Sequence, residues 1–192
     1  MGLPVELVQW LSAIHPLSGV ETEALAAHIS ECHYPKGHIL LHAGDVQKDL
    51  FLVYQGVQMA VSESGRGTHV MAFTYPPGLC AVPGSFPMQR PSSHSIVCLT
   101  DSRLGRLSHG HLTALYDRFP AVERLFRKLT EQVLAGVIDR HLEFHTLPIQ
   151  ERYVRFCNRS PHLLQVVPHR YIASYLGMDH TNFSKLYNTV RF

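Results

Sequence analysis

The first thirty residues have the hydrophobic spacing of two short amphipathic helices. Val5, Val8 and Leu11 recur at three-residue steps, which keeps them on one side of a helix. Leu25 and Ile29 resume the apolar pattern after a break that contains Pro and Gly. The chain is therefore expected to begin with two helices joined by a turn.

Between residues 34 and 108 the apolar runs become short, and Gly, Pro and Asp separate them at intervals of about ten residues. Short apolar runs with regular turn residues are typical of the strands of a β-sandwich or barrel. No helical pattern alternates with these runs, which argues against a doubly wound nucleotide-binding fold. The expected strands are residues 39–41, 50–54, 57–61, 69–75, 95–99 and 103–107.

A helical period returns after residue 109 and becomes unusually long. At 1.5 Å per residue, the pattern at residues 121–146 predicts a helix of about 39 Å. Two apolar stripes run side by side along it, so one stripe can pack on the helix's own domain and the other on a second chain. The alternative is a single buried helix in a monomer. The residues expected in the dimer interface are Val122, Phe126, Leu129, Val133 and Val137.

The C-terminal region has the pattern of two helices around a tight turn. Pro168 suits the first turn of a helix, Gly177 tolerates the positive φ that ends one, and Asp179 can cap the next. The small Ala173 stands where the two helices would cross. This spacing matches a DNA-binding helix-turn-helix, although an ordinary helical hairpin with a polar outer face fits it too. The residues expected to contact DNA are His169, Arg170, His180, Thr181, Asn182, Ser184, Lys185 and Asn188.

Charge is divided unevenly along the 192 residues, although the formal net charge is only +2. Residues 1–117 contain six Lys or Arg and nine Asp or Glu, a net charge of −3. Residues 118–192 contain eleven and six, a net charge of +5. A basic half that carries a helix-turn-helix pattern favours a nucleic-acid partner.

Several classes of protein do not fit the chain. The wide spacing of Cys32, Cys80, Cys98 and Cys157 provides neither a metal-binding cysteine motif nor a disulfide framework. The N-terminus lacks the features of a signal peptide, and no apolar run approaches the length of a membrane span. We therefore expect a cytoplasmic protein without membrane contact.

No catalytic motif stands out, so we predict neither an enzyme nor a resident metal or cofactor. Two alternatives involve histidines. His141 and His145 lie one helical turn apart and could share a metal or haem iron. His42 and His69 fall on expected strands, as a cupin-like enzyme would require. In a chain with fourteen histidines, solvent exposure or packing accounts for such pairs more simply.

The order of short helices, β-strands, long helix and C-terminal helix-turn-helix resembles the Crp/Fnr family of bacterial transcription regulators. The resemblance covers nearly the whole chain, and its last part looks most like the Bacteroidetes members. Its motifs are Lys36-Gly37-x-x-Leu40, Gly44-Asp45, Leu50-Phe51-Leu52-Val53-x-x-Gly56, Leu115-Tyr116-x-x-Phe119-Pro120 and residues 167–177.

This resemblance implies an α+β fold in three parts. Residues 1–118 would form an antiparallel β-roll (a jelly roll of the cyclic-nucleotide-binding type) with flanking helices. Residues 119–147 would be the dimerisation helix and hinge, and residues 148–192 the helix-turn-helix domain. The implied function is a homodimeric regulator that binds a near-palindromic duplex, with RNA polymerase and a small effector as further partners.

The chain departs from the family's cyclic AMP cassette, in which a Glu and a later Arg hold the nucleotide. Pro83 stands near the position of the Glu, and Ser92 stands at that of the Arg. Arg90 precedes the proline that the family's Arg would follow. Because a phosphate without a guanidinium partner loses its strongest contact, we expect no tight binding of cyclic AMP. If this pocket takes another effector, the expected contacts are Gly84, Ser85, Ser92 and Ser93.

The expected recognition helix also departs from the resemblance. Relatives often present Arg, Glu and Arg at positions that look like His180, Thr181 and Lys185 here. The operator of a relative therefore cannot be transferred to this chain. An alternative function is a ligand-binding module whose helix-turn-helix contacts another protein.

Overall fold

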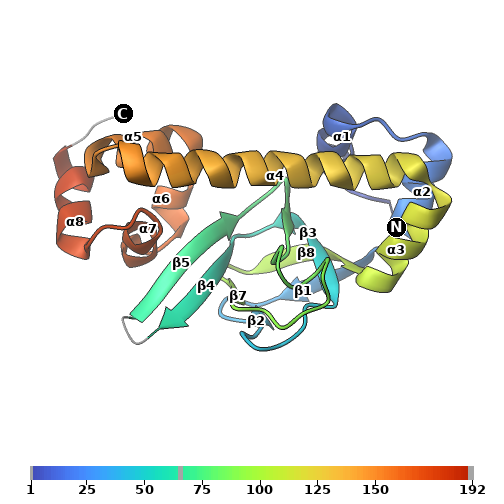
Figure 1. Cartoon of the computed structure of the whole chain (residues 1–192), viewed down its shortest axis with the longest axis horizontal. Coiled ribbons are helices and arrows are strands. Elements are labelled where there is room, and N and C mark those ends of the chain that lie inside the picture. The colour runs from blue at the N-terminus through green and yellow to red at the C-terminus, as the bar shows by residue number, and fades with distance from the viewer. Residues whose placement is uncertain (1, 65–66, 190–192) are drawn as a thin grey trace.

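Helix α4 (Pro120–Thr146) runs along most of the length of the molecule, and the other elements lie along it (Figure 1). The N-terminal helices lie at one end of α4, the strands lie beside its middle, and the C-terminal helices gather at its other end. The structure is a computed structural model that describes residues 2–64 and 67–189. Its sequence of elements agrees with the predicted order of helices, strands, long helix and helix-turn-helix.

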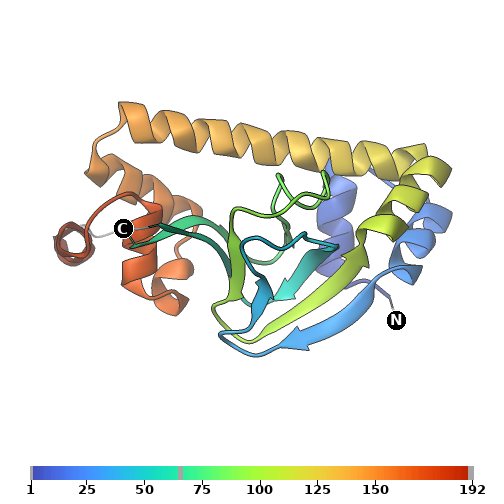
Figure 2. The same cartoon turned by 60° about the horizontal axis from the view of Figure 1, so that its bottom comes forward.

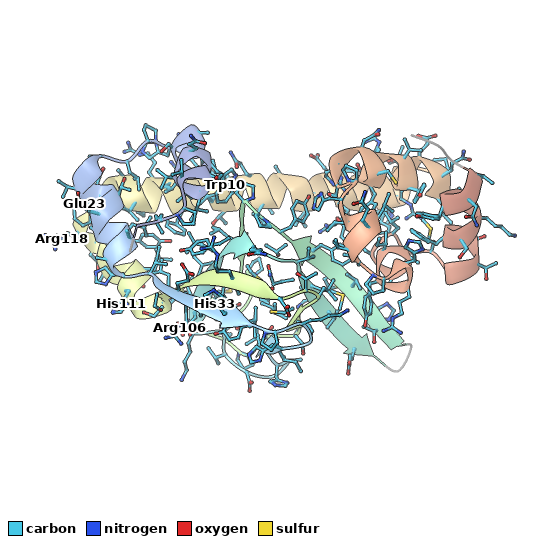
Figure 3. The ribbon with its side chains drawn as sticks, turned by 180° about the vertical axis from the view of Figure 1, so that it is seen from behind. Trp10, Glu23, His33, Arg106, His111 and Arg118 are labelled. Carbon is cyan, nitrogen blue, oxygen red and sulfur yellow. The ribbon has the colours of Figure 1, made fainter. Side chains whose placement is uncertain are left out.

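The two predicted N-terminal helices are present as α1 (Val5–Ile14) and α2 (Gly19–Ala27). A capping box begins α2, because the Ser18 hydroxyl accepts a hydrogen bond from the Glu21 backbone and the Glu21 carboxylate accepts one from the Ser18 backbone. Helix α3 (His109–Arg118) joins them around the start of α4. Figure 3 labels Glu23, His111 and Arg118 at this end of the molecule, away from the C-terminal helices.

The strands form two four-stranded antiparallel sheets, in the orders β1-β8-β3-β6 and β2-β7-β4-β5. This confirms the predicted antiparallel β-roll. The strands are β1 (Ser30–Tyr34), β2 (Ile39–Leu41), β3 (Asp49–Gln55), β4 (Gln58–Ser64), β5 (Gly67–Thr74), β6 (Gly78–Cys80), β7 (Ser95–Cys98) and β8 (Ser102–Ser108).

The pattern of the sequence did not predict β1 and β6. Strand β1 is an edge strand of five residues in which only Cys32 and Tyr34 are half-buried, so its alternation is too short to mark a strand. Its pairing with β8, from Ser30 opposite Arg106 to Tyr34 opposite Ser102, defines it instead. Strand β6 has only three residues and pairs with β3.

After α4 come α5 (Ile149–Arg159), α6 (Leu163–Val166), α7 (His169–Tyr175) and α8 (His180–Thr189). Helix α6 was not predicted. Gly177 ends the α7 segment with a φ of +65°, as predicted, and a Cβ at this position would lie 2.8 Å from the Phe144 ring. Glycine is therefore required here both by the backbone and by the close approach of α4.

The core of the C-terminal helices continues into the β-roll. Val57, Met59 and Val70 of the β4–β5 region belong to the same buried cluster as Phe156 and Ile172. A second cluster joins α1, α2 and α3 to the first half of α4 and to strands β3 and β8. A third fills the space between the sheets.

The predicted dimer stripe must be corrected at three of its five positions. Val122, Phe126 and Leu129 are 0%, 6% and 4% exposed, because the N-terminal helices and the β-roll cover them within one chain. Val133 and Val137 are 52% and 46% exposed. The boundary between buried and exposed apolar residues therefore lies across the helix, near its midpoint, and not lengthwise between two stripes.

Candidate functional site

Asp179 begins α8, the second helix of the helix-turn-helix. Its carboxylate accepts a 2.9 Å hydrogen bond from the backbone N–H of Asn182 and a second bond from the Asn182 side chain. The backbone bond is the main reason that the pKa of Asp179 lies below its ordinary value. The predicted N-cap of this helix is thus confirmed.

Helix α8 turns one apolar face inward and a polar face outward. Phe183 is fully buried and Leu186 packs partly against the same cluster. Ser184 is half-buried, and His180 is the first residue of the helix, although its side chain lies outside the described part. The predicted DNA contacts that are exposed on this helix are Thr181, Asn182, Lys185 and Asn188.

The two predicted DNA contacts on α7 have different surroundings. The half-buried His169 ring lies with its centroid 5.0 Å from that of Phe183 and 4.4 Å from that of Tyr187, so it helps to join α7 to α8. Arg170 is exposed, and its guanidinium lies over the Tyr171 ring and donates a 3.0 Å hydrogen bond to the Tyr171 hydroxyl. Arg170 is therefore the more accessible of the two.

Helix α7 docks on β5 through one serine, which the sequence analysis did not single out. The Ser174 hydroxyl accepts a 3.0 Å hydrogen bond from the Val70 backbone and donates a 3.1 Å bond to the Thr68 carbonyl. Since β5 is the edge of its sheet, Ser174 satisfies backbone groups that a neighbouring strand would otherwise pair. The Tyr75 and Ser160 hydroxyls add a 2.6 Å hydrogen bond between the β-roll and the end of α5.

The end of α4 also holds the helix-turn-helix. Arg140 donates a 2.5 Å hydrogen bond to the Tyr175 hydroxyl, and its guanidinium lies 5.0 Å from the centre of that ring. Glu143, whose side chain is 14% exposed, lies 3.3 Å from Arg155 and 4.0 Å from Arg159 of α5. The helix-turn-helix is thus held by contacts with both α4 and β5.

A cavity of about 1070 Å³ lies between the β-roll, the second half of α4 and the C-terminal helices. Figure 2 shows α4 passing over these elements along one side of the molecule. The β-roll contributes mainly apolar residues to its wall, among them Met71, Phe73, Leu79 and Val82. The helices contribute the charged groups of Asp139, Arg140, Glu143, Arg155 and Arg159.

The predicted ligand contacts do not line this cavity. Ser85 is fully buried; its hydroxyl accepts a hydrogen bond from the Gln47 backbone and donates one to the Arg90 carbonyl. Ser92 is also buried and is bonded to the backbone of His94. The prediction that these two serines contact a ligand is therefore wrong, because both hydroxyls hold the loop together. Gly84 and Ser93 are exposed but lie outside the cavity wall.

Gln47 organises the segment that the family uses as its nucleotide cassette. Its buried side chain donates to the Asp49 carbonyl at 2.8 Å and accepts from the Val82 backbone at 2.8 Å. Gln89, in turn, donates to the Gln47 carbonyl at 3.0 Å. Arg90 is exposed and is not among the cavity residues. An interior glutamine that bonds distant backbone groups has no periodic signal, so sequence reasoning missed it.

Within residues 2–64 and 67–189, no group of three or more His, Cys, Asp or Glu side chains is placed to hold a metal ion. The rings of His141 and His145 lie edge to face, 4.5 Å apart. Among the described helices, none is both long and apolar enough to span a membrane.

The cap of α8 predicts a pH-dependent stability. Above the ordinary pKa of an aspartate, 3.8, Asp179 is charged in both states, and its lowered folded pKa makes that charge stabilising. The contribution disappears as the pH falls through the folded pKa. We expect urea unfolding to show wild type more stable than Asp179→Asn near neutral pH, with the difference beginning to shrink near pH 3.8 and lost once the pH is below the folded pKa.

The control for this measurement is Asp45→Asn, which removes an exposed aspartate of the β-roll. A difference between wild type and Asp179→Asn that stays constant across this pH range would contradict the charged cap.

Comparisons with known proteins agree with this arrangement. Residues 31–119 match the family model of the cyclic nucleotide-binding domain. FixK2 from Bradyrhizobium japonicum has a similar structure, with 17% identity, a TM-score of 0.73 and 83% of each chain covered. The c-di-GMP-responsive global regulator CLP of Xanthomonas campestris is also 17% identical, with a TM-score of 0.67 over 89% of this chain and 90% of that one.

The catabolite activator protein of Thermus thermophilus is 21% identical, with a TM-score of 0.58 over 91% of this chain and 84% of that one. No curated protein matches the sequence. Residues 31–119 therefore match the cyclic nucleotide-binding domain family, and the chain as a whole has the fold of the Crp/Fnr regulators.

Proposed function

We propose that this protein is a homodimeric DNA-binding transcription regulator. The observation that carries the proposal is α8, whose capped N-terminus and exposed polar side chains follow a buried α7 across a glycine turn. The fold supports it, since CLP and the Thermus protein are named as a regulator and an activator. A cytoplasmic location and contact with RNA polymerase follow from this function as parts of the proposal.

In this proposal α8 enters the major groove of DNA. Thr181, Asn182 and Asn188 supply hydrogen-bonding groups for base edges, and Lys185 supplies a positive charge for guanine or phosphate. Arg170, at the start of α7, is placed for a backbone phosphate on the same groove. Two copies of α8 in a dimer would reach successive major grooves about 34 Å apart.

Removing the charge of Lys185 tests the DNA interface. With a duplex selected from a random pool, we expect Lys185→Ala to weaken binding about tenfold, the value of one charge-assisted contact. The slope of log affinity against log salt should also become shallower by about one. Fluorescence anisotropy at several salt concentrations measures both.

Lys36→Ala is the matched control, because it removes an exposed lysine of the β-roll. Equal affinities of all three proteins, or binding that does not depend on salt, would contradict the proposal. That result would favour the alternative in which the helix-turn-helix contacts a protein. The alternative is supported by the scarcity of charge on α8, where Lys185 is the one Lys or Arg.

The second half of α4 is the proposed dimer interface. Its most exposed apolar side chains are Val133, Leu134, Val137, Ile138 and Leu142, each between 46% and 57% exposed. An apolar surface of this kind on a helix with polar neighbours marks an interaction site. It replaces the originally expected interface, which included the three residues now found in the core.

A charge at this surface should separate the subunits. We expect Val137→Glu to raise the dimer dissociation constant at least tenfold in analytical ultracentrifugation, because two carboxylates would be buried without partners. Val20→Glu places the same charge on a 67% exposed valine of α2 and should leave the mass unchanged. A dimer that tolerates Val137→Glu as well as Val20→Glu would argue against this interface.

We also propose that cyclic AMP is not the effector. The support is the position of Arg90 away from the cavity and the use of Ser85 and Ser92 within their own loop. Calorimetric titration with cyclic AMP should show no binding at concentrations up to about 1 mM, since a cyclic phosphate would lack its guanidinium partner. A dissociation constant in the micromolar range would overturn this part of the proposal.

A further inference from the structure

The cavity between the β-roll and the C-terminal helices has two chemically different ends. We propose that it binds a mostly apolar small molecule with a single negative charge at one end. The site stands on the geometry of the cavity alone, and only its regulatory meaning rests on the proposed function.

The β-roll side of the cavity suits an apolar body. Met71, Phe73 and Leu79 face it from β5 and β6, and Val82 follows β6. Within the described chain, none of the cavity residues from the β-roll is a Lys, Arg, Asp or Glu. Desolvating a polyhydroxylated or multiply charged ligand against such a wall would be costly, so the part of the ligand that lies here has few polar groups.

The helical side supplies an excess of positive charge. Three guanidinium groups, from Arg140, Arg155 and Arg159, face two carboxylates, from Asp139 and Glu143. Glu143 lies near both Arg155 and Arg159, so one carboxylate is shared by two cations. The hydrogen bond described for Arg140 goes to the Tyr175 hydroxyl, which is neutral. One negative charge on a ligand would balance the remaining positive charge of this end.

The volume of the cavity fits this interpretation. At about 1070 Å³ it lies just above the range of about 300–1,000 Å³ found for small-molecule sites, so it has room for one such ligand. Its arginines come from α4 and α5 and not from the segment between β6 and β7, so the charged end of the ligand would lie beside the DNA-binding helices.

The same cavity includes groups that hold the helix-turn-helix in place. Tyr75 and Ser160, which bond each other, both line it, and so do Arg140 and Tyr175. A ligand that binds more tightly when these contacts are made, or when they are broken, would shift the orientation of α8.

Two fluorescent probes of nearly the same shape test the site in the full chain. 1-Anilinonaphthalene-8-sulfonate carries one negative charge, and N-phenyl-1-naphthylamine lacks the sulfonate and is neutral. We expect both to bind one molecule per chain. The double variant Arg155→Gln, Arg159→Gln should bind the sulfonate about tenfold more weakly and the neutral probe within twofold of wild type.

Glu143→Gln provides a test of opposite sign. It removes the carboxylate that competes for the two arginines, so the affinity for the sulfonate should rise while that for the neutral probe stays the same. Arg127→Gln is the matched control, since Arg127 is an exposed arginine of α4 outside the cavity. An unchanged sulfonate affinity in both the double variant and Glu143→Gln would overturn the proposed charged end.

Gly136 allows the cavity itself to be filled. It lines the cavity, and a Cβ built there would meet no atom within 4 Å. Gly136→Trp should weaken binding of both probes at least tenfold, whereas Gly136→Ala should leave it unchanged. Unaltered binding to Gly136→Trp, together with loss of binding to Leu134→Glu, would place the probes on the exposed face of α4 and refute the site.

These results are separate from DNA binding. A chain that binds the selected duplex but neither probe would retain the proposed function and lose this inference. A chain that binds the probes with the expected charge dependence, but no duplex, would retain the ligand site and lose the proposed regulator.

Discussion

The packing of the first half of α4 against the β-roll is the interaction on which the other parts depend. It fixes the helix along the molecule while the apolar side chains of its second half stay exposed. This second half then supplies the wall of the cavity, the proposed dimer surface and the anchors of the helix-turn-helix. A change in how α4 lies on the β-roll would therefore alter the cavity, the proposed dimer surface and the helix-turn-helix together.

Helix ends and turns were readable from the sequence because their determinants are local. Gly177 and Asp179 each act through their own backbone or that of a residue three positions away. Strand β1 was missed because its alternation covers only a few half-buried residues, and its pairing with β8, about seventy residues later, defines it instead. Caps and turns can therefore be predicted from neighbouring residues in the sequence, whereas the pairing partner of a strand cannot.

The errors at the candidate sites have the same origin. Helical periodicity shows which positions share a face, but it does not show where along α4 the β-roll ends. Phe126 and Val133 are both apolar and belong to the same stripe, yet Phe126 is buried and Val133 is exposed. The hydroxyl groups of Ser85 and Ser92 looked available because their partners are backbone atoms of the fold. The charged end of the cavity combines residues of α4 and α5, and it could not be recognised before both helices were placed around the cavity.

The bond between Ser174 and the edge of β5 has a consequence for solubility. An unpaired strand edge is a template for adding another strand, and proteins commonly cover such edges with a helix. Here the cover is the scaffold helix of the helix-turn-helix, so its release would expose Thr68 and Val70 as free backbone pairing groups. Any state in which this domain swings away from the β-roll therefore carries an inherent tendency toward strand exchange between molecules.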